Sequence, residues 1–314
     1  MAAPLQARPT WKLQSQDVTR DLDLTNQEVG YLLDLCHKVK KTPSRYANAL
    51  SGRYLSLLFE KPSLRTRLTF ELAIKQLGGD SVTVTGLIGD REPIKDVARN
   101  LDRWTQGIVA RVFFQRTIDE LAKWSAVPVI NALSDLYHPC QALADVFTLK
   151  EKFGDLRGLR VSFVGDGNNV AHSLMLSCVR LGASFAIATP EGYAPNADIV
   201  AQAREIGAAN GAAIEIVGDP AEAVRGAHAV YTDVWASMGQ EAEADIRKRA
   251  FKKYQVNSEL FALADKDGVF MHCLPAKRGL ETTDDVMEHP KSVVFDQAEN
   301  RLHAQKALLL MLLG

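Results

Sequence analysis

The feature that most constrains this chain is a regular alternation of short apolar segments with longer helical patterns, which begins near residue 50 and continues to the end. Short runs of aliphatic, β-branched and aromatic residues predict strands at Tyr54–Phe59, Ser81–Val84, Ile108–Phe113, Val127–Ile130, Arg160–Val164, Phe185–Ala188, Ala213–Val217, Ala229–Thr232, Val269–Met271 and Val293–Phe295. Longer patterns between them predict helices at Leu64–Leu77, Ile94–Trp104, Cys140–Lys152, Val170–Leu181, Ala197–Ala208, Glu241–Lys253 and Gln297–Leu313. This alternation predicts an α/β protein with doubly wound parallel sheets and helices on both faces.

The length of 314 residues fits two domains. The clearest boundary is the charged, glycine-containing segment Lys152–Gly158, which lies between a long predicted helix and a new strand. We therefore expect one domain over residues 1–152 and a second over residues 153–296. The last helix, about residues 297–314, is expected to return to the first domain, so that helices join the two.

Composition and charge exclude several classes of protein. Lysine and arginine total 37 against 38 aspartate and glutamate residues, so no overall basic excess favours nucleic acid or an anionic membrane. The four cysteines lack the paired spacing of a zinc finger or a disulfide scaffold. The N-terminal residues lack the apolar core of a signal peptide, and the apolar run Ala307–Leu313 is too short to cross a bilayer. These features predict a soluble, cytoplasmic protein with reduced thiols.

The first motif that could carry chemistry is Phe59–Arg67, in which an apolar strand runs into a Pro-Ser turn and a helix begins near Ser63. Gly78 stands where this helix is expected to end. Backbone N–H groups at a helix start, together with Arg65 and Arg67 in its first turn, can hold a phosphate. The alternative is a capped helix with solvated arginines. Cations oppose the helix dipole at this end, which favours the anion site.

A second motif, Leu136–Asp145, places Pro139 at the first position of a helix and puts His138 and Gln141 at its mouth. His138 could cap this helix or pack against it. Its imidazole could instead donate a hydrogen bond to a carbonyl oxygen that gains negative charge in a transition state.

A third motif, Val161–Val170, runs from a strand through a glycine turn into a helix, and Glu191 follows the next strand, as in a dinucleotide-binding fingerprint. Val170 occupies the place of the third glycine, however, and two asparagines stand where a pyrophosphate needs open backbone. A contact of Asn169 with a small polar ligand is therefore favoured over a nicotinamide cofactor.

Two later strands also end in residues that could carry chemistry. Asp233 follows one strand, just before a Ser237–Gly239 loop, and could pair with a substrate ammonium or merely cap a turn. Cys273 follows the other strand beside basic residues that favour its thiolate, although a cysteine behind an apolar strand often serves only packing. In the last helix, Arg301 could reach a site between the domains.

Taken together, these motifs resemble the ornithine carbamoyltransferase family over nearly the whole chain. The resemblance rests on motifs that occur in order: the phosphate loop Ser63–Arg67, the His-Pro-x-Gln motif His138–Gln141, the start of the ornithine domain Gly165–Asn169, the Asp-x-Trp-x-Ser-Met-Gly loop Asp233–Gly239, the His-Cys-Leu-Pro motif His272–Pro275 and the closing motif Glu299–Arg301. Leu64 stands where the family has threonine, and Leu87–Pro93 lacks a glutamine common in the family. The related aspartate carbamoyltransferases lack the Ser-Met-Gly loop and have proline in place of Cys273.

The resemblance implies transfer of the carbamoyl group of carbamoyl phosphate to the δ-amine of L-ornithine, which gives citrulline in arginine biosynthesis or, by the same chemistry, in citrulline breakdown. It implies that carbamoyl phosphate contacts Ser63, Leu64, Arg65, Thr66, Arg111, His138, Gln141, Cys273, Leu274 and Arg301. Ornithine would contact Asn169, Asp233, Ser237 and Met238. Catalysis would involve Arg111 and His138 at the carbonyl oxygen, and Cys273 and Asp233 at the amine.

The same resemblance implies no metal and no organic cofactor. The expected partners are the two small-molecule substrates and further copies of the chain, as a homotrimer or a multiple of trimers, with no nucleic-acid or membrane partner.

Three other functions stay open on the sequence. A relative in the same superfamily could carbamoylate N-acylated ornithine or putrescine. A nicotinamide-dependent oxidoreductase could be built on the turn at Gly165, and a non-catalytic regulator could bind an amino acid. A non-catalytic role would not explain why the arginines, His138 and Cys273 all lie at strand ends.

Overall fold

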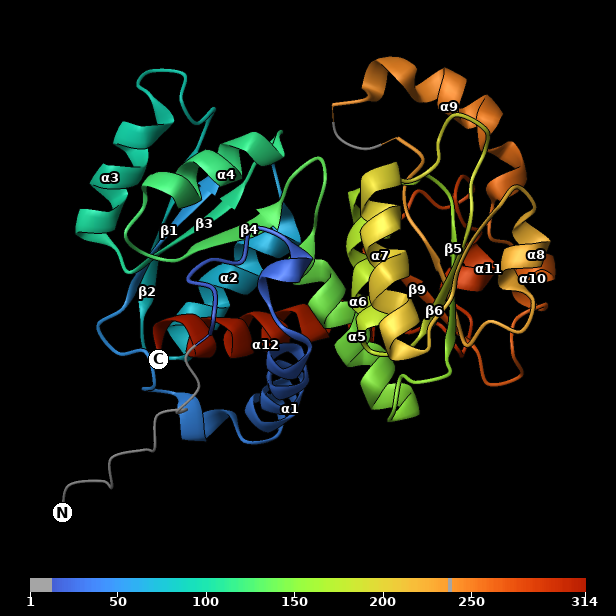
Figure 1. Ribbon diagram of the computed structural model, residues 1–314, viewed down its shortest axis with the longest axis horizontal. Coiled ribbons are helices and arrows are strands. Elements are labelled where there is room, and N and C mark those ends of the chain that lie inside the picture. Colours follow the sequence, from blue (N-terminus) through green and yellow to red (C-terminus); the bar gives the residue numbers. More distant parts are fainter. Residues whose placement is uncertain (1–12, 237–238) are drawn as a thin grey trace. The chain divides into compact units, whose positions relative to one another are not determined.

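The computed structural model describes residues 13–236 and 239–314. The chain divides into two compact units (Figure 1). One runs up to Phe147 and also includes Asn300–Gly314, and the other is Thr148–Glu299. Two long helices, α5 (Pro139–Phe153) and α12 (Val294–Leu313), each carry the chain from one unit into the other.

The first unit contains a parallel sheet of β1 (Tyr54–Phe59), β2 (Asp80–Thr85), β3 (Gly107–Arg111) and β4 (Val129–Leu133). Its strand order is β2-β1-β3-β4. The chain moves from β1 to one edge of the sheet and then crosses to the other side of β1, so its direction of winding changes between β1 and β3. The remaining elements are η1 (Asp21–Asp23), α1 (Asn26–Lys41), η2 (Pro43–Tyr46), α2 (Leu64–Gln76), α3 (Ile94–Trp104) and α4 (Gln115–Trp124).

Helices cover both faces of this sheet. α3 and α4 pack on one face around a buried cluster that includes Leu58, Ile108, Ala110, Ile118 and Leu121. A right-handed crossover from β1 to β2 puts α2 on the opposite face, and Figure 1 shows α1, α2 and α12 together there. Because both faces are buried, β3 is apolar along its length apart from its last residue, as central parallel strands usually are.

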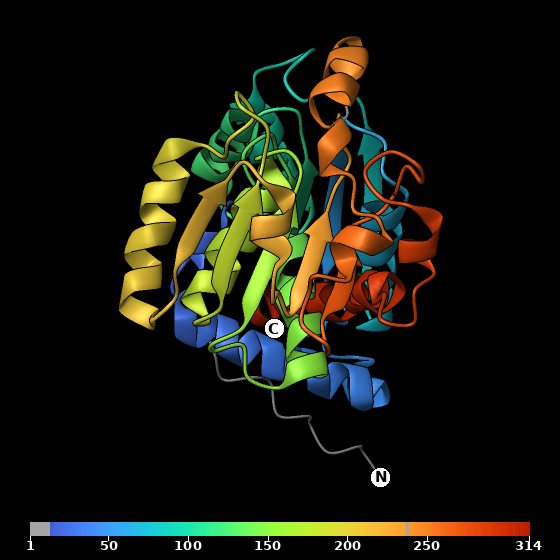
Figure 2. The same ribbon diagram turned by 90° about the vertical axis from the view of Figure 1, so that its right-hand side faces the viewer.

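The second unit contains a parallel sheet of β5 (Arg160–Val164), β6 (Ser184–Ala188), β7 (Ile214–Val217), β8 (Ala229–Thr232) and β9 (Val269–His272). Its order is β7-β6-β5-β8-β9, and Figure 2 shows the strands side by side. The direction of winding changes between β5 and β8. The remaining elements are α6 (Asn169–Arg180), α7 (Ala197–Asn210), α8 (Pro220–Val224), η3 (Glu241–Glu243), α9 (Ala244–Ala250), η4 (Lys252–Tyr254), α10 (Ser258–Phe261) and α11 (Asp284–Met287).

A buried aromatic cluster forms much of the core of the second unit. Trp235, Phe251, Phe261 and Phe270 pack with aliphatic residues of the sheet, including Val230. The ring of Phe251 stacks on that of Trp235 with centroids 6.0 Å apart. This cluster fixes the segments that follow β8, which is where several of the predicted site residues lie.

The predicted α/β class, with parallel sheets and helices, is confirmed. β1, β5, β8 and α3 have the bounds expected from the sequence. Among the described residues, no helix combines the length and the apolarity needed to cross a membrane.

The predicted strand Val293–Phe295 is wrong, because α12 begins at Val294. The chain touches the sheet only briefly there: Ser292 forms one isolated bridge with Phe270 of β9, and the N–H of Val293 donates to the carbonyl of Phe270 at 3.0 Å. Val293 and Val294 are both buried. Their apolar pattern therefore reflects core packing at the start of a helix.

The single predicted helix Glu241–Lys253 is also wrong, since the segment is divided into η3, α9 and η4. Phe251 lies at the break between α9 and η4 and is fully buried. Its ring packs edge-on against Tyr193 and stacks on Trp235. Packing of this side chain coincides with the interruption that helical periodicity alone did not predict.

Candidate functional site

Each sheet changes its direction of winding at one place, and ligands of doubly wound sheets bind beyond the carboxyl ends of the strands at such a place. In the first unit, this place is the end of β1, followed by Ser63, and the end of β3 at Arg111. In the second unit, it is the end of β5, followed by Gly165–Asn169, and the end of β8, followed by Asp233. The topology of each unit thus places the predicted motifs where ligands are expected.

The start of α2 is the centre of a cationic cluster in the first unit. Ser63 caps the helix, since its hydroxyl accepts the N–H of Thr66 at 3.2 Å. The hydroxyl of the fully buried Thr66 also accepts from the guanidinium of Arg301 at 2.6 Å and from that of Arg111 at 3.4 Å. Arg111 and Arg301 are buried as well. Two positive charges and the positive end of a helix therefore meet at one place.

His138 and Gln141 lie at the start of α5, where His138 offers a neutral hydrogen-bond donor and Gln141 an acceptor. Burial, with Arg301 and then Arg111 as neighbouring cations, holds the pKa of His138 well below its usual range, so the ring is neutral at pH 7. The amide nitrogen of the buried Gln141 donates to Asp145 at 2.8 Å. Its carbonyl oxygen has no partner among the described residues. A carbamoyl group offers a carbonyl oxygen and an NH₂ group, which match this pair.

The other residues of the phosphate loop that were predicted to bind phosphate are more exposed than Thr66. The side chain of Leu64 is on the surface, with 69% of its area exposed. Arg67 forms an ion pair with Glu71 at 2.8 Å on the exposed face of α2, which is the solvated alternative considered for the arginines of this motif. Arg65 is half-buried.

The carboxylate of Asp233 is the centre of a cluster in the second unit. The side chain follows β8 and is largely buried, with 7% of the residue exposed. One oxygen accepts from the thiol of Cys273 at 3.1 Å, and the other accepts from the side-chain amide of Asn168 at 2.9 Å. A carboxylate and a thiol in contact at a strand end can together bind an amine and take up its proton.

Asn168 is a site residue that the sequence analysis missed. The sequence pointed to the next residue, Asn169, which begins α6 and is half-buried. The carbonyl oxygen of the Asn168 side chain caps α6 while its amide nitrogen binds Asp233. Its N-cap position was the available signal, because asparagine is favoured there. The predicted ornithine contacts Ser237 and Met238 lie outside the described residues.

His272 fixes the turn after β9. Its Nδ1 accepts the N–H of Leu274 at 2.8 Å, and its Nε2 lies 3.2 Å from a carboxylate oxygen of Glu281; both side chains are fully buried. Leu274 has a φ of 57°, a left-handed conformation that leucine rarely adopts and that is found chiefly at functional sites. His272 therefore shapes the backbone beside Cys273.

Asp233, His272 and Cys273 are the described residues whose spacing could suit a metal ion, since their ligand atoms lie within 4.8 Å of one another. Hydrogen bonds, however, engage both ring nitrogens of His272. The thiol of Cys273 is directed at Asp233. As arranged, each of the three side chains is engaged in a hydrogen bond: Cys273 with Asp233, and His272 with Leu274 and Glu281.

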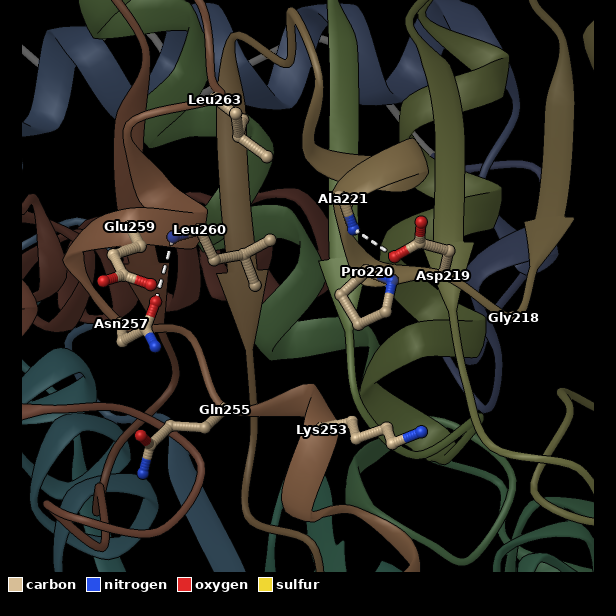
Figure 3. Close-up of a pocket in the computed structure, with 10 residues that line it drawn as sticks. All are labelled: Gly218, Asp219, Pro220, Ala221, Lys253, Gln255, Asn257, Glu259, Leu260 and Leu263. Carbon is tan, nitrogen blue, oxygen red and sulfur yellow. Dashed lines mark hydrogen bonds between the residues drawn. The ribbon is translucent and has the colours of Figure 1, made fainter.

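A surface pocket of about 510 Å³ lies in the second unit and is lined by residues between Gly218 and Leu263 (Figure 3). The lining side chains of Asp219 and Asn257 are used within their own loops, where they accept the N–H groups of Ala221 and Leu260. The lining includes none of the predicted site residues. We therefore assign the chemistry to the strand-end clusters and not to this pocket.

Known proteins resemble both halves of the chain. Residues 16–151 match the family described as aspartate/ornithine carbamoyltransferase, carbamoyl-P binding domain, and residues 157–312 match its Asp/Orn binding domain. Ornithine carbamoyltransferase of Thermococcus kodakarensis is 50% identical over 302 residues, which cover 95% of each chain. The anabolic ornithine carbamoyltransferase of Pyrococcus furiosus is 48% identical over 302 residues, again 95% of each.

Similarity extends to the solved structures. Ornithine carbamoyltransferase from Pyrococcus furiosus superimposes with a TM-score of 0.94 at 47% identity, over 96% of this chain and 98% of that one. The structural similarity between the two proteins therefore covers both units, including the motifs at their strand ends.

Proposed function

The chain belongs to the aspartate/ornithine carbamoyltransferase family, and from that premise we propose which side chains act when it transfers the carbamoyl group of carbamoyl phosphate to the δ-amine of L-ornithine. The products are L-citrulline and phosphate. The family match and the similar proteins of that name support this transfer, and nothing in them favours the oxidoreductase alternative.

The first domain, over residues 1–152 and completed by the last helix, binds carbamoyl phosphate. The observation that carries this proposal is the convergence of Arg111 and Arg301 on Thr66 at the start of α2. The two guanidinium groups and the positive end of the helix meet at this place. A phosphate group is bound by guanidinium groups and by the N–H groups of a helix start. Ser63 and Arg65 complete the phosphate contacts, and Leu64 contributes through its backbone because its side chain is exposed.

The carbonyl end of carbamoyl phosphate lies against the neutral donor and the open acceptor of α5. His138 and Arg111 donate to the carbonyl oxygen, and the carbonyl oxygen of Gln141 accepts from the NH₂ group. As the amine nitrogen bonds to the carbonyl carbon, negative charge builds on that oxygen. The charge disperses when the bond from carbon to the phosphate oxygen breaks. Each preorganised donor of this kind contributes about 10²–10³ in rate.

The second domain, residues 153–296, binds the amine substrate. An alkylammonium with a pKa of about 10.4 is almost fully protonated at neutral pH, so the free amine costs about 4–5 kcal/mol at about 1.36 kcal/mol per pKa unit. The paired Cys273 thiol and Asp233 carboxylate orient this nitrogen and take up its proton. Asn169 holds the carboxylate of ornithine, and Asp233 with Ser237 and Met238 holds its α-amino end. Leu274 lies beside the reacting group through the turn after β9.

Substrate choice gives the direct test of this function. Citrulline formation should be measured with carbamoyl phosphate and, side by side, ornithine, N-acetylornithine, putrescine and aspartate. Ornithine is expected to give kcat/KM at least 100-fold above each of the others. Preference for N-acetylornithine or putrescine would place the chain with the alternative carbamoyltransferases, and turnover of none of the four amines would overturn the transferase assignment.

A role in arginine biosynthesis is supported by the similarity to an anabolic relative. The composition of the chain favours a cytoplasmic location for this role.

We also propose a homotrimer, supported by an apolar stripe on the first unit. Leu64, Leu68 and Leu72 recur every fourth residue along α2 and are 69%, 46% and 44% exposed, so they share one face of the helix. The edge strand β2 exposes Val82 and Val84 as well. Apolar side chains arranged in this way are typical of a protein interface. A second copy of the same chain would bury them.

A further inference from the structure

Arg247, on α9, is a buried arginine whose guanidinium joins three loops at the carboxyl edge of the second sheet. Its Nη1 donates to the carboxylate of Asp166, after β5, at 2.8 Å and to the carbonyl of Trp235, after β8, at 3.1 Å. The guanidinium also lies 4.9 Å from the ring centroid of Tyr193, which is in the loop after β6. Arg247 and Asp166 are 7% and 8% exposed. One side chain thus anchors loops from three neighbouring strands.

The anchored loops hold Asp233 from two directions. On one side, the carbonyl of Asp166 accepts the N–H of Asn168 at 2.8 Å, and the side-chain amide of Asn168 binds Asp233 at 2.9 Å. On the other side, Trp235 follows Asp233 in the chain by two residues. Release of either loop would therefore change where the carboxylate of Asp233 points.

The charge of Arg247 also favours the ionised form of Asp166. Burial raises the pKa of Asp166 to about 6, the carboxylates of Asp233 and Glu243 add to the rise, and Arg247 opposes it. Without this guanidinium, the pKa of Asp166 would rise further, and α9 would lose its ion pair with the loop after β5. Arginine suits the position because its planar, forked guanidinium can donate to two acceptors and also lie against an aromatic ring, a geometry that the compact ammonium of lysine does not offer.

We propose that Arg247 is a positioning residue for ornithine, which acts through Asp166 and the Trp235 carbonyl to fix the carboxylate of Asp233. This inference rests on the proposed role of Asp233 in ornithine binding. Arg247 does not itself touch the substrate. Its loss weakens the ornithine step. The carbamoyl phosphate step is unchanged, because its phosphate and carbonyl-oxygen contacts are proposed to lie in the first unit.

The test compares Arg247→Gln, Arg247→Lys, Asp166→Asn and the double variant Arg247→Gln/Asp166→Asn in the full-length protein. KM is measured separately for ornithine and carbamoyl phosphate, with kcat and thermal unfolding in parallel. Glu243→Gln is the matched control, because Glu243 binds the same guanidinium at 2.9 Å but has a side chain 55% exposed.

Arg247→Gln is expected to raise KM for ornithine at least 10-fold and to change KM for carbamoyl phosphate less than two-fold. Arg247→Lys should recover part of the loss, and Glu243→Gln should stay within two-fold of wild type. The double variant should be no worse than the poorer single variant, because the two residues act through one contact.

Equal rises in both KM values, or a lower unfolding temperature with an unchanged KM for ornithine, would overturn the inference. Should Arg247→Gln fail to fold, the same comparison of the two KM values and the unfolding temperature is made with Arg247→Lys and Asp166→Asn. Asp233→Asn distinguishes a failure of this inference from a failure of the proposed role of Asp233 in ornithine binding. If Asp233→Asn leaves KM for ornithine unchanged, the proposed role of Asp233 is wrong; if it raises KM while the Arg247 variants do not, only the positioning role is wrong.

Discussion

Arg301→Gln is expected to lower kcat/KM for carbamoyl phosphate by about 10²–10³-fold. Arg301 is 3% exposed and its guanidinium lies 2.6 Å from the hydroxyl of Thr66, so its charge acts in a site with little water. Loss of one donor to a developing oxyanion costs about 2.7–4 kcal/mol. Coulomb's law gives about 4 kcal/mol for unit charges about 4 Å apart at an effective dielectric constant of about 20. The two values agree, and together they set the expected range.

The same substitution should change the titration of His138. Burial lowers the pKa of this imidazole most, and Arg301 is the first of two cations that lower it further. Removal of Arg301 therefore raises the pKa of His138 toward its ordinary range. A histidine-selective NMR titration of wild type and variant measures this shift independently of activity.

Steady-state citrulline formation at varied carbamoyl phosphate gives the main readout for Arg301→Gln. Asp296→Asn is the control: it lies on the same helix, α12, but its ion pair with Lys152 is on the surface. Such a pair contributes only about 0–1 kcal/mol, so this variant should keep its activity and its unfolding temperature. A value of kcat/KM for Arg301→Gln within three-fold of wild type would refute the proposed role of the cationic cluster.

Three further variants test other parts of the structure. Burial, chiefly, raises the pKa of Asp17 to about 6 although Asp17 accepts the N–H of Val129. The folded state therefore favours the neutral acid, and its stability falls as pH rises from about 4 to above 6. Asp17→Asn should raise the free energy of unfolding by about 1–3 kcal/mol at pH 8 but not at pH 3, as measured by urea denaturation. Cys273→Ser should lower kcat more than it weakens binding of a phosphonate analogue of carbamoyl phosphate, and an unchanged kcat would remove the thiol from the mechanism. Leu68→Glu with Leu72→Glu should convert the proposed trimer to a 34.5 kDa monomer in light scattering, whereas a wild type that is already monomeric would contradict the proposed interface.

Much of the fold could be predicted because its strands are short apolar runs bounded by turns. The segment β1, for example, is buried over nearly its whole length between helices, so its sequence is apolar apart from Ser56. The approach fails where core packing produces the same pattern, as at Val293 and Val294. It also fails where a helix breaks at a residue that packs into the core, as at Phe251, because periodicity does not show which residue the core buries.

The candidate site could be predicted only where one segment carries its own signal. A strand end followed by a capped helix marked Ser63, and a strand end alone marked Asp233. Arg247 gave no such signal, because it meets Asp166 across 81 positions of the chain. A surface-type sequence of charged residues surrounds it, and only the fold shows that its guanidinium is buried.

Binding of one molecule that joins both substrates tests the central claim most directly, which is that the cationic cluster and the Asp233 cluster serve a single reaction. Isothermal titration calorimetry with ornithine whose δ-nitrogen carries a phosphonoacetyl group would measure it. We expect affinity at least 100-fold above that of phosphonoacetamide or ornithine alone, and a loss of at least 10-fold in both Arg301→Gln and Asp233→Asn. Loss in only one of these variants, or affinity no better than that of the separate halves, would contradict the claim.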